Sequence, residues 1–162
     1  MLIKLKNKDT LIIDEFEFKC AIGKKGLKKN KIEGDKSTPK GTFGLGKLYY
    51  RADRVSKPET SLKIKKITKN LGWCDIPNIK YYNQEVSSLK NVNKEKLFRK
   101  DKKYDYLITI NYNKKRIKNK GSAIFIHLTK NYESTNGCIA ISKKDFLILA
   151  KLINKKTFIK LN

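Results

Sequence analysis

The feature that most constrains the fold is a series of short strand-like runs separated by turn residues. The runs "LIIDEF" and "FEFKCAIG" are rich in β-branched and aromatic residues and are bounded by Asp, Gly and Lys. A long turn-rich loop, "GKKGLKKNKIEGDKSTPKG", follows, and "TFGLGKLYYR" then resumes strand character. Many short strands of this kind favour a mainly β sandwich or barrel.

The second half of the chain continues this pattern and adds one helix. Strands are predicted at "YDYLITINYN", "SAIFIHL", "CIAI" and the closing "TFIKL". Between the last two, Ser142 opens "SKKDFLILAKLIN", where Ser142 and Asp145 have the form of a capping box. Apolar residues then recur at helical spacing. We therefore predict a mainly β sandwich or barrel with one or two short helices.

The length of 162 residues suits one domain with a single core, and no internal repeat is present. Residues 56–103 lack continuous apolar periodicity and combine many lysines with scattered aromatic residues. We predict a single domain over residues 1–162, with an insertion or lid at about 56–103. No apolar run is long enough for a signal peptide or a membrane span, so the sequence by itself predicts a soluble chain.

The charge of the chain is strongly unbalanced. With 39 Lys+Arg against 15 Asp+Glu, the formal net charge is +24. Such a surface attracts polyanions, including nucleic acid, acidic lipid headgroups and anionic wall polymers. The lysines are nevertheless dispersed among abundant Asn and Ile, as biased base composition would also produce. The charge alone therefore identifies no partner.

The cysteines argue against a structural metal. The chain has three cysteines, and the spacing of Cys20, Cys74 and Cys138 contains no Cys-x-x-Cys. A single histidine cannot complete a usual zinc set, so we expect no metal site and no cofactor. We expect Cys20 and Cys74 to be packing residues, since neither has a base nearby in sequence.

The only histidine of the chain, His127, lies late in a β-branched run, and Cys138 directly follows Gly137. The intervening loop, residues 129–137, is long enough to bring Cys138 back beside His127. An imidazole is the usual base for a cysteine nucleophile, and backbone N–H groups near the thiol suit a developing oxyanion. On the spacing alone, an interior histidine and an inert buried thiol remain the alternative.

Several motifs in order carry a resemblance to a known family. "IFIHLTKNYESTNGCIAIS" resembles the active-site signature of the YkuD-type L,D-transpeptidases, the cysteine enzymes that remodel peptidoglycan. "KIEGDKSTPKGTFGL" resembles the Glu-Gly-Asp-x-x-Thr-Pro-x-Gly-x-Phe segment of that family. The segments "YYRADR", "GWCDIP", "YYNQEV", "YDYLITINYN" and "GSAIFIH" also occur in the expected order. The resemblance extends over most of the chain and implies a YkuD-like β-sandwich or barrel.

The resemblance also implies roles for individual residues. Cys138 would be the nucleophile, His127 the general base and acid, and the Leu128 carbonyl the group that orients His127. Backbone N–H groups of Asn136, Gly137 and Cys138 would hold the oxyanion. The implied reaction is attack on an L,D-peptide bond of a peptidoglycan stem, with release of a D-amino acid. The acyl group would pass to an amine, or to water in L,D-carboxypeptidase action.

The implied partners are peptidoglycan stem peptides in the periplasm or cell wall, where a basic surface would also attract anionic envelope polymers. Two positions depart from many family members: Asn136 and Ala140 stand where those members carry His and Arg or Asn. The sequence resembles a branch with a Thr-x-Gly-Cys-x-Ala form. We hypothesise that Arg51 or Arg54 replaces the missing arginine, because a guanidinium grips a carboxylate through two bonds. The other predicted substrate-binding residues are Trp73, Tyr82 and Thr135.

Two alternatives belong to other classes of protein. A basic nucleic-acid-binding module would use the +24 charge and the lysines and aromatic residues of the middle segment. The sequence contains no DNA- or RNA-binding motif, so we expect no nucleic-acid partner. A catalytically silent wall-binding relative would keep the fold without turnover, and the presence of both His127 and Cys138 argues against it.

Overall fold

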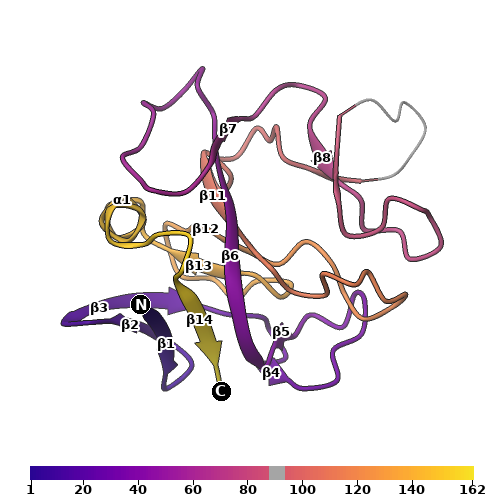
Figure 1. Cartoon of the computed structure of the whole chain (residues 1–162), viewed down its shortest axis with the longest axis horizontal. Helices are drawn as coiled ribbons and strands as arrows, with labels where there is room; N and C mark the ends of the chain where they lie inside the picture. Colours follow the sequence, from indigo (N-terminus) through magenta and orange to yellow (C-terminus); the bar gives the residue numbers. More distant parts are fainter. Residues whose placement is uncertain (88–93) are drawn as a thin grey trace.

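The computed structural model describes residues 1–87 and 94–162, and its main feature is a nine-stranded sheet (Figure 1). The strands follow the order β11-β12-β13-β3-β2-β1-β14-β6-β7, and β6 also pairs with β11. This second pairing closes the sheet into a barrel, with β7 added beside β6. The prediction of a mainly β fold is confirmed. The strands of the sheet are β1 (Leu2–Lys6), β2 (Thr10–Ile13), β3 (Phe16–Ala21), β6 (Gly41–Tyr50), β7 (Ile64–Lys66), β11 (Tyr106–Ile110), β12 (Phe125–Leu128), β13 (Ile139–Ile141) and β14 (Phe158–Leu161).

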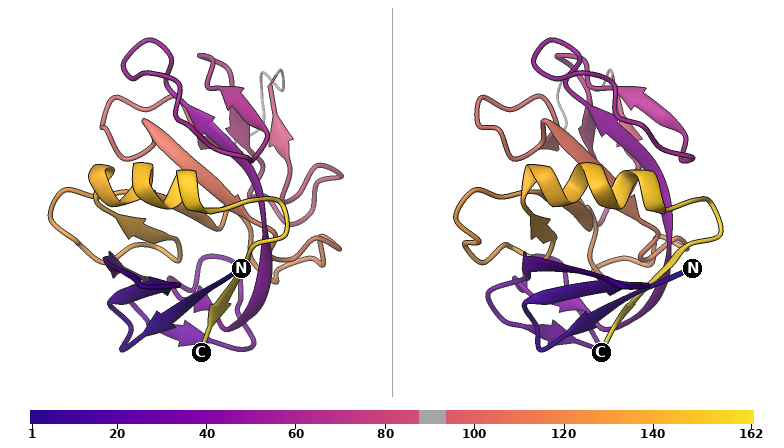
Figure 2. Two further views of the ribbon diagram at one scale, coloured as in Figure 1. Left: turned by 60° about the vertical axis from the view of Figure 1, so that its left-hand side comes forward. Right: turned by 90° about the vertical axis from the view of Figure 1, so that its left-hand side faces the viewer.

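The predicted helix is α1 (Lys143–Leu152), which lies across the barrel in Figure 2. It begins where expected, because the Ser142 side chain accepts the Asp145 N–H at 3.1 Å. Phe146, Leu149 and Ala150 form its buried face and join the main core. No helix in the described parts of the chain combines the length and the apolar character needed to cross a membrane.

The strand that carries His127 lies between two neighbours. β12 pairs antiparallel with β11, which places Leu107 opposite His127. On its other side β12 pairs parallel with β13, which places Ala140 opposite His127. A strand held on both edges fixes its side chains, so the position of His127 is set by the sheet rather than by a loop.

The two faces of β12 contribute to different apolar clusters. Ile126 and Leu128 belong to the main core, which the barrel and α1 enclose. Phe125 points the other way, into a second cluster that includes Tyr104 and Leu107. This alternation follows from the pleat of a strand, in which successive side chains point to opposite faces.

Residues 56–103, the predicted insertion or lid, contribute Ile67, Leu71 and Leu97 to the second cluster and also supply β7 of the main sheet. This region includes residues 88–93, which lie outside the described residues. The described part contains a small sheet in the order β10-β8-β9, drawn beside the barrel in Figure 1. Elsewhere, two short strands of the turn-rich loop pair in parallel. These minor strands are β4 (Leu27–Lys28), β5 (Thr38–Pro39), β8 (Gly72–Trp73), β9 (Glu85–Val86) and β10 (Glu95–Lys96).

Candidate active site

His127 projects from β12, and one of its ring nitrogens forms a hydrogen bond with the backbone. Its Nδ1 lies 2.9 Å from the Leu128 carbonyl oxygen. A carbonyl only accepts hydrogen bonds, so Nδ1 carries the proton and Nε2 is the basic nitrogen. The ring of Tyr104 packs edge-on against the imidazole, with centroids 5.3 Å apart. The ring is therefore fixed both in tautomer and in orientation.

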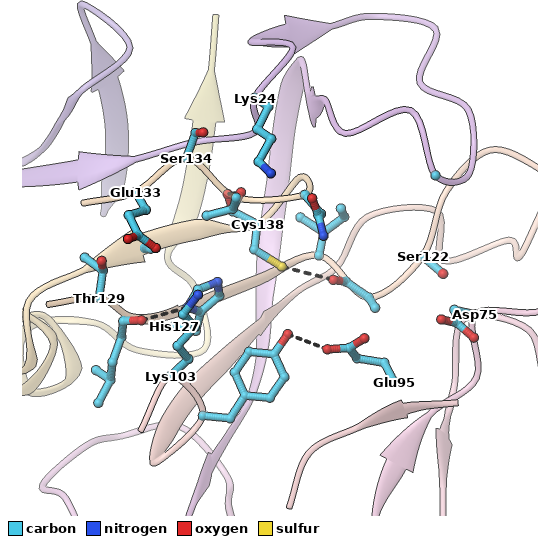
Figure 3. Close-up of a pocket in the computed structure, with 18 of the residues that line it drawn as sticks. Lys24, Asp75, Glu95, Lys103, Ser122, His127, Thr129, Glu133, Ser134 and Cys138 are labelled. Carbon is cyan, nitrogen blue, oxygen red and sulfur yellow. Dashed lines mark hydrogen bonds between the residues drawn. The ribbon is translucent and has the colours of Figure 1, made fainter. Parts of the chain in front are cut away.

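The Cys138 thiol enters the same cavity from the chain just before β13. His127 and Cys138 both line this cavity of about 450 Å³, and Figure 3 shows both side chains directed into it. The Cys138 Sγ donates to the Ala123 carbonyl at 3.2 Å and accepts the Phe125 N–H at 3.4 Å. The topology thus brings together the histidine and the cysteine that the sequence singled out.

The turn before Cys138 is held by two threonine hydroxyls. The Thr135 Oγ1 accepts the Gly137 N–H at 3.0 Å and donates to the Cys138 carbonyl at 2.6 Å. The Thr38 Oγ1 donates to the Gly137 carbonyl at 2.9 Å. Gly137 has φ +138°, and a Cβ there would lie 2.8 Å from the Ser37 carbonyl oxygen. Only glycine fits this position, so the loop from the Thr-Pro segment shapes the cysteine turn.

The bond to Thr135 corrects one part of the predicted oxyanion site. The Gly137 N–H was expected to face the oxyanion together with those of Asn136 and Cys138, but it already donates to Thr135. For the N–H groups of Asn136 and Cys138, the described part of the chain provides no hydrogen-bond partner. These two remain the donors available to a developing negative charge.

Burial moves both reactive groups toward their neutral forms. The pKa of His127 falls to about 4, chiefly because burial disfavours the imidazolium. The pKa of the Cys138 thiol rises to about 12, chiefly because burial disfavours the thiolate. At neutral pH the resting site therefore holds a neutral imidazole and a neutral thiol. The imidazole has its Nε2 unprotonated and the thiol keeps its proton, and both pKa shifts disfavour transfer of that proton in the resting site.

Neither arginine of the "YYRADR" segment lines the cavity. The Arg51 guanidinium is buried and binds both carboxylate oxygens of Asp53 at 2.8 Å, as well as the Arg99 carbonyl at 2.6 Å. Arg54 pairs with Asp105 at 3.3 Å. The prediction that one of them binds a substrate carboxylate in this cavity does not fit the geometry. Both guanidinium groups lie outside the cavity wall and already bind carboxylates of the chain itself.

The predicted aromatic residues also lie outside the cavity wall. The Tyr82 ring is buried, its hydroxyl donates to Glu33 and it accepts the Gly121 N–H at 2.9 Å. Trp73 packs edge-on against Phe125, with centroids 5.4 Å apart, and lines a different cavity of about 530 Å³. Tyr82 contacts the cavity wall through Glu33, and Trp73 contacts β12 through Phe125. Of the predicted substrate-binding residues, Thr135 alone lines the cavity with Cys138.

The charged residues of the cavity wall were missed by sequence reasoning. The cations come from separate parts of the chain, and four carboxylates share the same wall, several of them labelled in Figure 3. Burial raises the pKa of Asp75, assisted by the charges of Glu95 and Glu33. Nothing in a lysine-rich sequence distinguishes a lining lysine from a solvated one. The charged lining residues are Lys24, Lys31, Arg99 and Lys103, with Glu33, Asp75, Glu95 and Glu133.

These carboxylates do not form a metal site. Within residues 1–87 and 94–162, no three side chains of the His, Cys, Asp and Glu types gather closely enough to hold a metal ion. The chemistry that the described residues offer is that of a thiol, an imidazole and two backbone N–H groups around one cavity. That set suits acyl transfer through a thioester.

Comparison with solved structures finds the same fold. Two crystal structures of the "helical cell shape determining protein Pgp2 from Campylobacter jejuni", one of them a point variant, superpose with TM-scores of 0.55 and 0.53 at 19% sequence identity. The matches cover 98% of this chain but only 46% and 45% of those chains, so it spans less than half their length. At this identity the likeness concerns the fold alone.

Comparison at the sequence level shows the family. No match was found among curated proteins. The sequence model of the YkuD family, described as "L,D-transpeptidase catalytic domain", matches residues 3–161. That match spans nearly the whole chain, including the strand that carries His127 and the turn that carries Cys138. The chain therefore belongs to the YkuD family of L,D-transpeptidase catalytic domains.

Proposed function

We propose that this domain is a cysteine acyltransferase of peptidoglycan stem peptides, with Cys138 as nucleophile and His127 as general base and acid. The observation that carries the proposal is the shared cavity, in which an imidazole with Nε2 as its basic nitrogen accompanies a thiol. Family membership supplies the substrate class, since the geometry by itself specifies acyl transfer. The chemistry needs no cofactor.

The first half-reaction forms a thioester. As the Cys138 Sγ attacks the carbonyl carbon on the L-side of an L,D-peptide bond, its proton passes to the His127 Nε2. The N–H groups of Asn136 and Cys138 donate to the oxyanion. When the C–N bond breaks, His127 returns the proton to the departing amine, and a D-amino acid leaves. The Leu128 carbonyl keeps the imidazole oriented through both transfers.

The second half-reaction releases the acyl group. An amine from another stem attacks the thioester carbon, and His127 takes the proton that the amine loses. The C–S bond then breaks, and His127 returns a proton to the Cys138 sulfur. Water in place of the amine gives L,D-carboxypeptidase action by the same steps.

Because His127 and Cys138 are both neutral at rest, the thiol loses its proton only during the reaction. Because burial raises the pKa of Cys138 to about 12, a standing thiolate is not formed at neutral pH. The proton instead moves to His127 as the sulfur attacks, and the thiol must first leave the Ala123 carbonyl that it contacts at rest. The domain thus holds its nucleophile protonated until a substrate carbonyl occupies the cavity.

Cations of the cavity wall take the place of the arginine absent at Ala140. Arg99 and Lys103 line the cavity close to His127, where they lower the pKa of the imidazole in addition to the effect of burial. A stem peptide that carries carboxylates would meet them there. The basic surface would hold the domain near the anionic envelope, and we place its action in the periplasm or cell wall.

The test is incubation of the chain with purified sacculi, followed by analysis of the released muropeptides. New cross-linked products would indicate transfer to an amine, and stems shortened by one D-amino acid would indicate transfer to water. Cys138→Ala is the matched control and is expected to give neither product. Identical products from the Cys138→Ala variant, or no product from the folded unaltered chain, would contradict the proposal.

A further inference from the structure

One lysine of the cavity wall is buried, in contrast to the solvated majority. The Lys31 side chain is 3% exposed, and its Nζ pairs with the Asp35 Oδ1 at 2.7 Å. Lys28 pairs with the same carboxylate at 3.4 Å, but its side chain is 46% exposed. Two cations thus share one carboxylate, and the buried one lines the cavity together with Cys138.

The Lys31 side chain runs between two glycines of the site. A Cβ on Gly121, which has φ +98°, would lie 2.9 Å from the Lys31 Cε. A Cβ on Gly137 would lie 3.5 Å from the Lys31 Nζ. Gly121 precedes β12, which carries His127, and Gly137 directly precedes Cys138. The absence of both Cβ atoms leaves the channel through which the ammonium reaches the cysteine turn.

Asp35, which holds this lysine, is itself held by hydrogen bonds within its own loop. Its carboxylate also accepts the Ile32 N–H at 2.8 Å, the Ser37 N–H at 3.0 Å and the Ser37 hydroxyl at 2.7 Å. Although burial acts in the other direction, these bonds and the one from Lys31 keep the pKa of Asp35 well below its usual range. The carboxylate is therefore ionised at neutral pH, and it fixes the position of the Lys31 ammonium.

We propose that Lys31 is a positioning residue of the active site, whose buried ammonium stabilises negative charge on the Cys138 sulfur and on the adjoining oxyanion. A fixed cation acts more strongly in a buried site than in water, because the surroundings screen it less. A nearby cation favours the thiolate over the thiol. The Lys31 charge thereby opposes the effect of burial on the pKa of Cys138, at the moment when His127 takes the proton. This inference rests on the proposed function.

The experiment is alkylation of Cys138 by iodoacetamide over a range of pH, with the Cys138 peptide quantified by mass spectrometry. Lys31→Met removes the charge and keeps the apolar stem. We expect the rate at neutral pH to fall ~10-fold, which corresponds to a rise of about one unit in the thiol pKa. Lys28→Met, which removes the exposed partner of Asp35, is the matched control and is expected to leave the profile unchanged.

A second pair of variants tests the same charge through its channel. Gly121→Ala places a Cβ against the Lys31 stem and is expected to slow alkylation in the same direction. Gly26→Ala is its control, because Gly26 also has positive φ (+69°), nothing lies within 4 Å of a Cβ there, and it does not line the cavity. If Lys31→Met does not fold, Lys31→Gln keeps a donor for Asp35 without the charge and is measured in its place.

The outcomes separate this inference from the proposed function. An alkylation profile of folded Lys31→Met that superimposes on that of the unaltered chain would overturn it, and so would failure of both lysine variants to fold. Alkylation requires no peptidoglycan. A shifted profile with no muropeptide products would therefore support the role of Lys31 while contradicting the proposed function. Muropeptide products together with an unshifted alkylation profile would support the proposed function and contradict the role of Lys31.

Discussion

Both faces of β12 are buried, but their side chains have different surroundings. Ile126 is 0% exposed on one face, and His127 is 6% exposed on the other. Ile126 belongs to the main apolar core together with Phe146 of α1. His127 meets the Leu128 carbonyl, the ring of Tyr104 and a cavity lined by charged residues.

This difference shows that burial alone does not distinguish a core residue from a site residue on such a strand. The alternation of the strand places Ile126 in the main core and His127, one residue further along, in the site. Substitutions on the two faces should therefore separate stability from activity. The face of Ile126 should respond in unfolding experiments, and the face of His127 in turnover and in titration.

The largest effect is expected on the chemical face. His127→Gln removes the base while keeping a polar side chain in the cavity. Because general acid–base catalysis contributes roughly 10²–10⁴-fold, turnover of stem peptides should fall by about that factor. Muropeptide formation rates at matched protein concentrations measure this. A variant that retains the full rate would remove His127 from the mechanism.

The corresponding substitution on the core face should act on stability. Ile126→Ala leaves a cavity in the main core, and we expect the free energy of unfolding to fall by about 2–5 kcal/mol. Chemical denaturation measures this loss. Ile117→Ala is the control, since Ile117 is exposed, and a change within about 0.5 kcal/mol is expected there. Equal losses in the two variants would contradict the division between the faces.

The pH dependence of stability should also distinguish the faces. The pKa of His127 is lowered from 6.5 to about 4 in the folded chain. Between these two pH values the imidazole binds a proton in the unfolded chain but not in the folded chain. The free energy of unfolding therefore falls as the pH falls from 6.5 to 4. The loss of stability caused by this group is about 3 kcal/mol, and it is complete near pH 4. Unfolding of the unaltered chain and of His127→Gln from pH 7 to pH 4 measures it. Parallel curves would show that His127 titrates normally.

The smallest effect is expected where the thiol rests. Ala123 has φ +53°, a left-handed conformation that favours glycine, and its carbonyl accepts the Cys138 thiol. Ala123→Gly should relieve this strain, with a gain of up to about 1 kcal/mol in the free energy of unfolding. Thermal or chemical unfolding measures it. A clear loss of stability would contradict this. It would indicate that packing of the Ala123 methyl group stabilises the fold by more than the backbone strain destabilises it.

Much of the fold could be predicted from local pattern. Alternation located the strands around His127, and the Ser142 cap located the start of α1, because both depend on residues close together in sequence. The pairing of β6 with β11, which closes the barrel, leaves no such local signature. The candidate nucleophile and base were also apparent, since the only histidine and a Gly-Cys turn stand out in this composition.

The surroundings of the site could not be predicted in the same way. Lys31 reaches Gly121 and Gly137 only because the folded chain brings three separate loops together. In a sequence with 39 Lys+Arg, no local feature marks Lys31 and Arg51 as buried. The guanidinium of Arg51 suits a substrate carboxylate, but in the folded chain it binds the carboxylate of Asp53 instead. The role of a charged residue depends on partners that are distant in sequence.

The central claim is that Cys138 is the nucleophile, and intact-mass spectrometry with a carbapenem tests it most directly. Carbapenems acylate the cysteine of such enzymes, so the unaltered chain should gain the mass of one adduct. His127→Gln should gain it more slowly, and Cys138→Ala, which retains Cys20 and Cys74, should gain none. An adduct that forms equally on Cys138→Ala would contradict the assignment of the nucleophile.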